Sequence, residues 1–64
     1  MNSKHNIVDK ILELIGNGFE RAQAEQMFDV MRCDGRIFYA DDYEGFQIRD
    51  GVDLIAVAVE VING

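Results

Sequence analysis

The chain has few of the side chains that most often carry out chemistry. It contains a single cysteine, Cys33, and a single histidine, His5. One cysteine excludes an internal disulfide and indicates a reducing, intracellular setting. His5 lacks the partners of a catalytic triad or a zinc site, and Cys33 falls at the expected C-terminal end of a helix, where the dipole disfavours a thiolate. We therefore expect no enzyme activity, no cofactor and no metal site.

Long hydrophobic runs are also missing. The longest one, LIAVAVEVI, is interrupted by Glu60 and is well short of the ~18 residues that a membrane-spanning helix needs. The stretch MNSKHNIVDK at the start has no apolar segment of the signal-peptide type. We therefore expect a cytoplasmic protein that does not bind membranes.

Positive charge is scarce, and its distribution is uneven. Six Lys and Arg stand against twelve Asp and Glu, which gives a net charge of −6. Residues 1–32 carry five acids and four bases, whereas residues 33–64 carry seven acids and two bases. Two helices followed by a β-wing would suit a DNA-binding domain, but surfaces this acidic repel phosphates. The composition excludes direct nucleic-acid binding and favours a basic protein surface as the target.

A first helix is expected at about 7–15, where apolar residues recur at helical spacing. Asn6 is the expected N-cap, and Gly16 follows the last apolar residue as the terminating glycine. The turn GNG at 16–18 is short, so this helix and the next one are expected to pack as an antiparallel hairpin.

A second helix is expected from position 19 or 20 to Arg32, and Asp34-Gly35 ends it. Its apolar positions again follow the helical period and predict one buried stripe. The members of this stripe are Ala24, Met27, Phe28 and Met31.

A β-hairpin is expected next. The segments Arg36–Ala40 and Phe46–Arg49 are rich in strand-forming residues and are separated by five residues that end in Gly45. Alternation places Ile37 and Tyr39 on one face of the hairpin and Phe38 on the other.

The last segment, VDLIAVAVEVI, contains many strand-forming residues, but its polar residues favour a helix. Asp53 and Glu60 are seven apart, so a helix places them on the same side. We expect a helix at about 51–62, with Asp50 as its cap and Asp53 three residues later as part of an acidic capping box. The polar side of this helix is narrow, so it is either the central core helix or partly an interface.

These elements predict a single domain over residues 1–64. Its fold class is α+β, in the order α-α-β-β-α, with a helical hairpin, a β-hairpin and a C-terminal core helix.

Acidic residues cluster in the second half and form the candidate binding site. Tyrosine is a preferred anchor in binding surfaces, and Tyr43 lies among these charges. A calcium loop is not indicated, because Tyr43 stands where the second ligand belongs if Asp41 is the first. Carboxylates along a rigid hairpin could instead imitate a row of phosphates toward a basic groove. The predicted partner-binding residues are Asp34, Asp41, Asp42, Tyr43, Glu44, Asp50 and Asp53.

The run from Ala24 to Glu60, with DGRIFYADDYEGFQIRDGVDLIAVAVE as its core, resembles small acidic phage-encoded anti-CRISPR proteins that act on type I systems, type I-E first and type I-C second. The resemblance implies a non-enzymatic inhibitor in the cytoplasm of a host bacterium. Its implied target is the Cascade surveillance complex, at the surface that receives duplex DNA, so that the inhibitor competes with DNA. A block of nuclease-helicase recruitment stays open as a second mode.

A different class of function also fits the sequence. The chain could be a small acidic protein-interaction module, such as an antitoxin-like protein or a homodimeric regulator, with no link to CRISPR. A homodimer built through the apolar last helix should be lost on Val57→Lys or Val59→Lys. The sequence leaves the choice between monomer and homodimer open.

Overall fold

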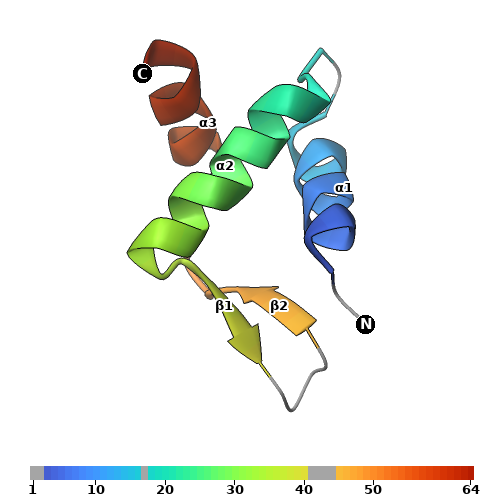
Figure 1. Ribbon diagram of the computed structural model, residues 1–64. Helices are drawn as coiled ribbons and strands as arrows, with labels where there is room; N and C mark the ends of the chain where they lie inside the picture. Colours follow the sequence, from blue (N-terminus) through green and yellow to red (C-terminus); the bar gives the residue numbers. More distant parts are fainter. Residues whose placement is uncertain (1–2, 17, 41–44) are drawn as a thin grey trace.

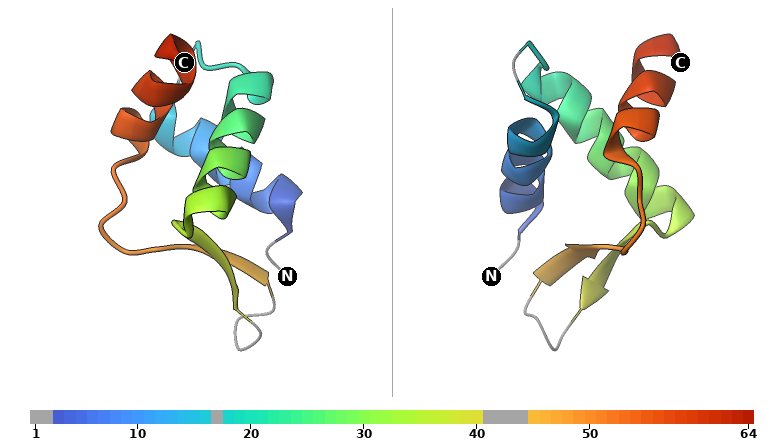
Figure 2. Two further views of the ribbon diagram at one scale, coloured as in Figure 1. Left: turned by 60° about the vertical axis from the view of Figure 1, so that its left-hand side comes forward. Right: turned by 180° about the vertical axis from the view of Figure 1, so that it is seen from behind.

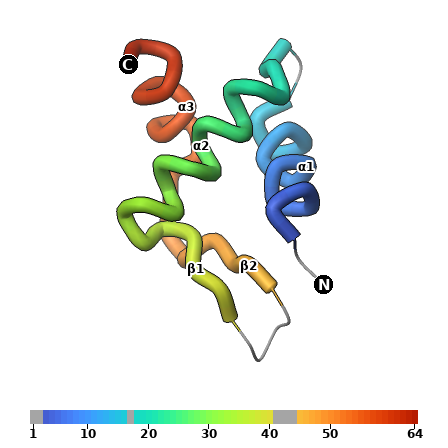
Figure 3. The backbone as a smooth tube through the Cα atoms, in the orientation of Figure 1, coloured from blue at the N-terminus to red at the C-terminus, as the bar shows by residue number. Residues whose placement is uncertain are grey.

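The computed structural model describes residues 3–16, 18–40 and 45–64. Within these residues the elements are α1 (Lys4–Ile15), α2 (Arg21–Asp34), β1 (Ile37–Ala40), β2 (Gly45–Ile48) and α3 (Leu54–Asn63). The order confirms the predicted α-α-β-β-α fold. In Figure 1, α2 lies between α1 and α3, and the hairpin lies beside the C-terminal end of α2. α1 and α2 run in opposite directions, as the chain trace in Figure 3 shows.

The core is built around α2. The view from behind in Figure 2 shows that α2 runs across both of the other helices. The predicted stripe of α2 is buried as expected, and Met27 and Met31 are 0 % exposed. α1, β1 and α3 each pack at least one fully buried apolar residue in the same core as this stripe. These residues are Ile7, Val8 and Ile11 from α1, Ile37 from β1, and Val57 and Ala58 from α3.

α1 begins three residues earlier than predicted. Its N-cap is Ser3, whose hydroxyl accepts a hydrogen bond from the backbone N–H of Asn6 at 3.3 Å. Asn6 itself lies in the first turn of the helix, so its expected role as the cap is wrong. The end of the helix is as predicted: Gly16 has φ +96° and its N–H donates to the Leu12 carbonyl.

α2 extends two residues beyond the predicted end. Gln23 supports its start, because its side-chain oxygen accepts the backbone N–H of Glu20. The helix continues to Asp34 and stops at Gly35, which adopts the left-handed conformation with φ +87°. A residue with a Cβ rarely adopts this φ, so the predicted stop at Asp34-Gly35 is confirmed by the backbone geometry.

The hairpin packs against the helices through one face. Ile37 pairs with Ile48 and Tyr39 pairs with Phe46, which places all four side chains on the same face of the sheet. The Phe46 ring meets the Phe28 ring of α2 edge to face at 5.2 Å, and it meets the Tyr39 ring at 5.4 Å. The first of these aromatic pairs fixes the hairpin against α2, and the second joins β1 to β2.

α3 begins at Leu54 rather than at position 51. Asp53 is its N-cap and accepts hydrogen bonds from the backbone N–H groups of Ile55 and Ala56 at 3.1 and 3.2 Å. The expected cap at Asp50 is therefore wrong. Gly51 has φ +84°, which interrupts any helical path from Asp50, so the later carboxylate supplies the cap instead.

This assignment of the cap can be tested by two alanine substitutions. We expect Asp53→Ala to lower the free energy of unfolding by ~1 kcal/mol, because two N–H groups of the first turn lose their acceptor. Asp50→Ala should change it by less than ~0.5 kcal/mol, as is usual for an exposed residue without such a role. Urea unfolding followed by circular dichroism measures both. A larger effect at Asp50 would show that the cap lies there.

Candidate protein-binding surfaces

The described members of the predicted partner-binding set come from three segments of the chain. Asp34 is the last residue of α2, Asp50 lies in the turn after β2, and Asp53 caps α3. The other four predicted residues lie outside the described part of the chain, so their placement as one acidic site stays a prediction. They are Asp41, Asp42, Tyr43 and Glu44.

Asp34 already has a cationic partner inside the molecule. Its carboxylate accepts a hydrogen bond from the Arg36 backbone N–H at 3.0 Å and one from Arg36 Nε at 2.7 Å. The same guanidinium lies 3.5 Å from the Glu60 carboxylate of α3. Hydrogen bonding to Arg36 lowers the pKa of Asp34 below its ordinary value and raises the pKa of Arg36. Arg36 thus neutralises part of the negative charge where α2, β1 and α3 meet.

Asp53 and Asp50 differ in how far their carboxylates are already used inside the molecule. Asp53 uses its carboxylate as a cap, so part of its hydrogen-bonding capacity is taken up by α3. Asp50 is exposed and lines a cavity of about 460 Å³ together with Phe38 and Arg49. Within residues 3–16, 18–40 and 45–64, no cation lies within ion-pair distance of Asp50.

Two further arginines serve the fold rather than the surface charge. Arg49 donates to the Gly35 carbonyl at 2.7 Å, and its guanidinium lies 5.1 Å from the centre of the Phe38 ring. Arg32 donates to the Ile37 carbonyl at 3.2 Å and lies 5.0 Å from the centre of the Phe46 ring. Both guanidinium groups hold the hairpin to the end of α2 by hydrogen bonds and cation–π contacts.

The second surface is the outer face of α3, which we define as Ile55, Val59 and Ile62. These residues follow the spacing i, i+4, i+7 and so lie along one side of the helix. Their exposed fractions are 57, 50 and 59 %. Val57, on the opposite side of α3, is fully buried instead, and so is the small side chain of Ala58 beside the outer face. α3 is thus apolar on two sides, and one of them faces solvent.

This surface was only partly foreseen from the sequence. The narrow polar side of the last helix indicated an interface, and Val59 was one of the residues named for it. Val57, the other one, is 0 % exposed and belongs to the core, so Val57→Lys would disrupt folding rather than report on binding. Apolar residues occupy nearly every position of this segment, so the sequence carried no signal that separates the outer face from the core.

The reactive side chains form no assembled centre in the described part of the chain. His5 Nε2 lies 3.3 Å from Asp9, and His5 Nδ1 lies 2.9 Å from Arg21 on the exposed surface of α1 and α2. Cys33 is exposed in the last turn of α2. Among the described residues, no group of three or more His, Cys, Asp or Glu side chains could hold a metal ion. No helix there is long and apolar enough to cross a membrane.

Comparisons with protein-family models, with curated proteins and with solved structures find no match to this chain.

The Asp34–Arg36 pair makes a prediction about pH. Because the pKa of Asp34 is lowered in the folded state, its carboxylate stabilises the fold above the ordinary value of 3.8, and this contribution is lost as the pH falls through the folded value. We expect Asp34→Asn to destabilise the protein at neutral pH and the difference from the parent to shrink below pH 3.8. Urea unfolding over this range measures it, with Asp50→Asn as the control. A difference that stays constant with pH would contradict the role of the pair.

Proposed function

We propose that this protein is a non-enzymatic protein-interaction module that self-associates through the outer face of α3. The observation that carries the proposal is the exposure of Ile55, Val59 and Ile62 along one side of a helix whose opposite residues are already buried. A surface helix normally has one apolar side, which faces the core, and polar residues on the side that faces solvent. Contiguous exposed apolar surface of this kind marks contact sites in soluble proteins.

A second copy of the chain suits this face because the face is uncharged. The sequence of α3, LIAVAVEVIN, has one charged residue, Glu60. Glu60 follows Val59 directly in the sequence, so it points about 100° away from Val59 around the helix. Two copies with a net charge of −6 each therefore meet without opposing carboxylates at the centre of the contact. A domain of this size also gains from extra burial, since it covers only about 60 % of its unfolded surface when alone.

The salt dependence of this association has a defined sign. The two copies repel each other over a distance of about one Debye length, ~8 Å at physiological ionic strength, and added salt screens that repulsion. The apolar contact itself is not weakened by salt. Self-association through α3 is therefore expected to strengthen as the salt concentration rises.

The proposal is tested by Val59→Lys. We expect this variant to be a monomer under conditions in which the parent is a dimer, with an association constant at least ~10-fold lower, because a lysine charge would have to be buried in an apolar contact. Sedimentation equilibrium or light scattering, at low and high salt, measures the association.

Val30→Lys is the matched control, because Val30 is an exposed valine of α2 (40 %) outside the outer face. It should leave the association unchanged. A parent protein that stays monomeric at all accessible concentrations, or an equal loss in both variants, would contradict self-association through α3.

A second candidate function has its own support. Asp50 is exposed without an ion pair among the described residues, while all four arginines of the chain donate hydrogen bonds inside the molecule. The chain carries a net charge of −6, because its six bases offset only half of its twelve carboxylates. This favours binding to a basic, nucleic-acid-handling protein, and the type I Cascade complex is the target that the sequence resemblance suggests.

For this candidate we expect Asp41→Lys combined with Asp42→Lys to abolish binding to purified Cascade while the circular dichroism spectrum stays unchanged. The interaction of the parent with Cascade should weaken as salt rises, mainly through slower association, which is opposite to the salt dependence of self-association. Competition with target DNA distinguishes a block of DNA binding from a block of nuclease recruitment. Charge-reversed protein that binds Cascade as tightly as the parent would rule out the acidic mechanism.

A further inference from the structure

The sequence of α3 fits a β-strand as well as a helix. Every second position from 55 to 61 is β-branched, which is the period of a strand. These residues are Ile55, Val57, Val59 and Val61. β-branched side chains favour strands and are less favourable in helices, because a helix restricts their rotamers. A strand places all four on one side, whereas α3 buries Val57 and leaves Ile55 and Val59 exposed.

The first six residues of α3, LIAVAV at 54–59, are all apolar, and we call them the switch segment. The switch segment contains no charged residue, proline or glycine. Six-residue segments of this composition are the ones that stack as identical strands in cross-β assemblies. Asp53 and Glu60 stand directly on either side of it, as charged residues commonly do beside segments prone to such assembly. The switch segment therefore has the composition and the flanking charges of a strand that pairs with its own copies.

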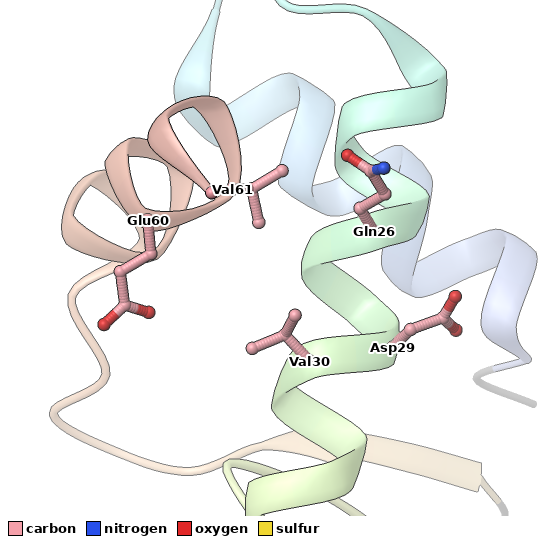
Figure 4. Close-up of a pocket in the computed structure, with 6 residues that line it drawn as sticks. Gln26, Asp29, Val30, Glu60 and Val61 are labelled. Carbon is pink, nitrogen blue, oxygen red and sulfur yellow. The ribbon is translucent and has the colours of Figure 1, made fainter.

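Within the described residues, α3 is held to the rest of the domain on one side. Val57 and Ala58 are its buried residues. Farther along the helix, a cavity of about 320 Å³ lies between α2 and α3, and Figure 4 shows the side chains of Val30 and Val61 projecting into it from the two helices. Helices gain stability from close packing, and a gap between them forfeits those contacts. The C-terminal half of α3 is therefore loosely packed against α2.

Two polar interactions complete the attachment of α3, and both lie at the surface. The Asp53 carboxylate accepts the backbone N–H groups of Ile55 and Ala56 at 3.1 and 3.2 Å. Glu60 lies 3.5 Å from Arg36 and its side chain is 63 % exposed. An ion pair this exposed contributes little to stability. Elements with few buried contacts open at a lower free energy than the whole domain, so we expect α3 to open before α1 and α2 do.

We propose that the switch segment is a conformational switch, helical while α3 packs on α2 and a β-strand paired with the same segment of other copies once α3 opens. The strand has Ile55, Val57 and Val59 on one side and small alanine side chains on the other. Copies stacked in this way satisfy the backbone N–H and C=O groups that the helix gives up. The hairpin is a poorer partner, because β1 and β2 have four residues each and are shorter than the switch segment.

This conversion is independent of the self-association proposed above. A dimer joined through the outer face keeps α3 helical, so its circular dichroism retains the helical signal, whereas the conversion replaces that signal with one of β-sheet. A helical dimer that never converts would contradict the switch alone. A monomer that converts would contradict self-association alone.

The first test changes how firmly α3 is held. The full chain is incubated with agitation and followed by thioflavin T fluorescence and circular dichroism, and fibre diffraction checks for the ~4.7 Å strand spacing. Asp53→Ala is compared with Asp53→Asn, because both remove the same charge but asparagine still caps the helix. We expect Asp53→Ala to assemble about 5-fold faster than Asp53→Asn, which is the rise in the open population expected from loss of the cap.

The second test changes the switch segment itself. Ala56 is exposed in the first turn of α3, where a glutamate favours the helix dipole and also puts a charge inside the segment. The matched control is Ala22→Glu, which places the same residue at an exposed position in the first turn of α2. Both variants should have the circular dichroism of the parent before incubation. We expect Ala56→Glu to assemble at least ~10-fold more slowly than Ala22→Glu.

Hydrogen exchange of the assembled protein locates the strands, and we expect the protected amides to lie in the switch segment. Equal rates for Ala56→Glu and Ala22→Glu, or protected amides in the hairpin rather than at 54–59, would overturn the proposal. It would also fail if the parent and Asp53→Ala both kept their helical signal and gave no thioflavin T fluorescence throughout.

Discussion

The burial of one side of α2 is the constraint on which the whole structure depends. α1, β1 and α3 each place apolar residues against Met27, Met31 and their neighbours, and the hairpin adds the contact between Phe46 and Phe28. In the described part of the chain, no other element covers the outer face of α3, where Ile55, Val59 and Ile62 are exposed. α3 is consequently covered on the side that faces α2, and its outer face stays exposed. The candidate interaction surface follows directly from how the core is made.

The arginines also join the elements of the fold to one another. Arg36 joins the end of α2 to α3 through Asp34 and Glu60, and Arg32 and Arg49 join α2 to the hairpin through carbonyl groups and aromatic rings. Arg21 links α2 to α1 through Asp9 and lowers the pKa of that carboxyl group. These cations lie at the contacts between elements, so they do not offset carboxylates on other parts of the surface, such as Asp50. The surface is acidic because twelve Asp and Glu stand against six Lys and Arg, and the four arginines among these bases also hold the elements together.

The order of the elements and the stripe of α2 could be predicted from the sequence, because apolar periodicity reports directly on which side of an element is buried. The first residues of α1 and α3 could not. Ser3 and Asn6, like Asp50 and Asp53, are all good caps by type, and the choice between them depends on backbone angles such as that of Gly51. Periodicity also could not tell which apolar residues of α3 stay uncovered, since that depends on how many other elements reach the helix. Val57 and Val59 look alike in the sequence, yet only Val57 is covered.

The position of the outer face on α3 has a consequence for assembly. The hairpin lies at the C-terminal end of α2, away from α3 (Figure 1), so two chains that join through their outer faces leave both hairpins open, and the pair becomes bivalent. A partner with two matching sites then engages both copies at once, and the second contact forms at a high effective concentration rather than from free solution. Such avidity raises overall affinity by ~10²–10⁴ without any new contact, provided that the spacing of the two sites matches that of the two copies. A weak contact on a very small domain gives in this way a tight complex whose strength depends on the concentration of the domain itself.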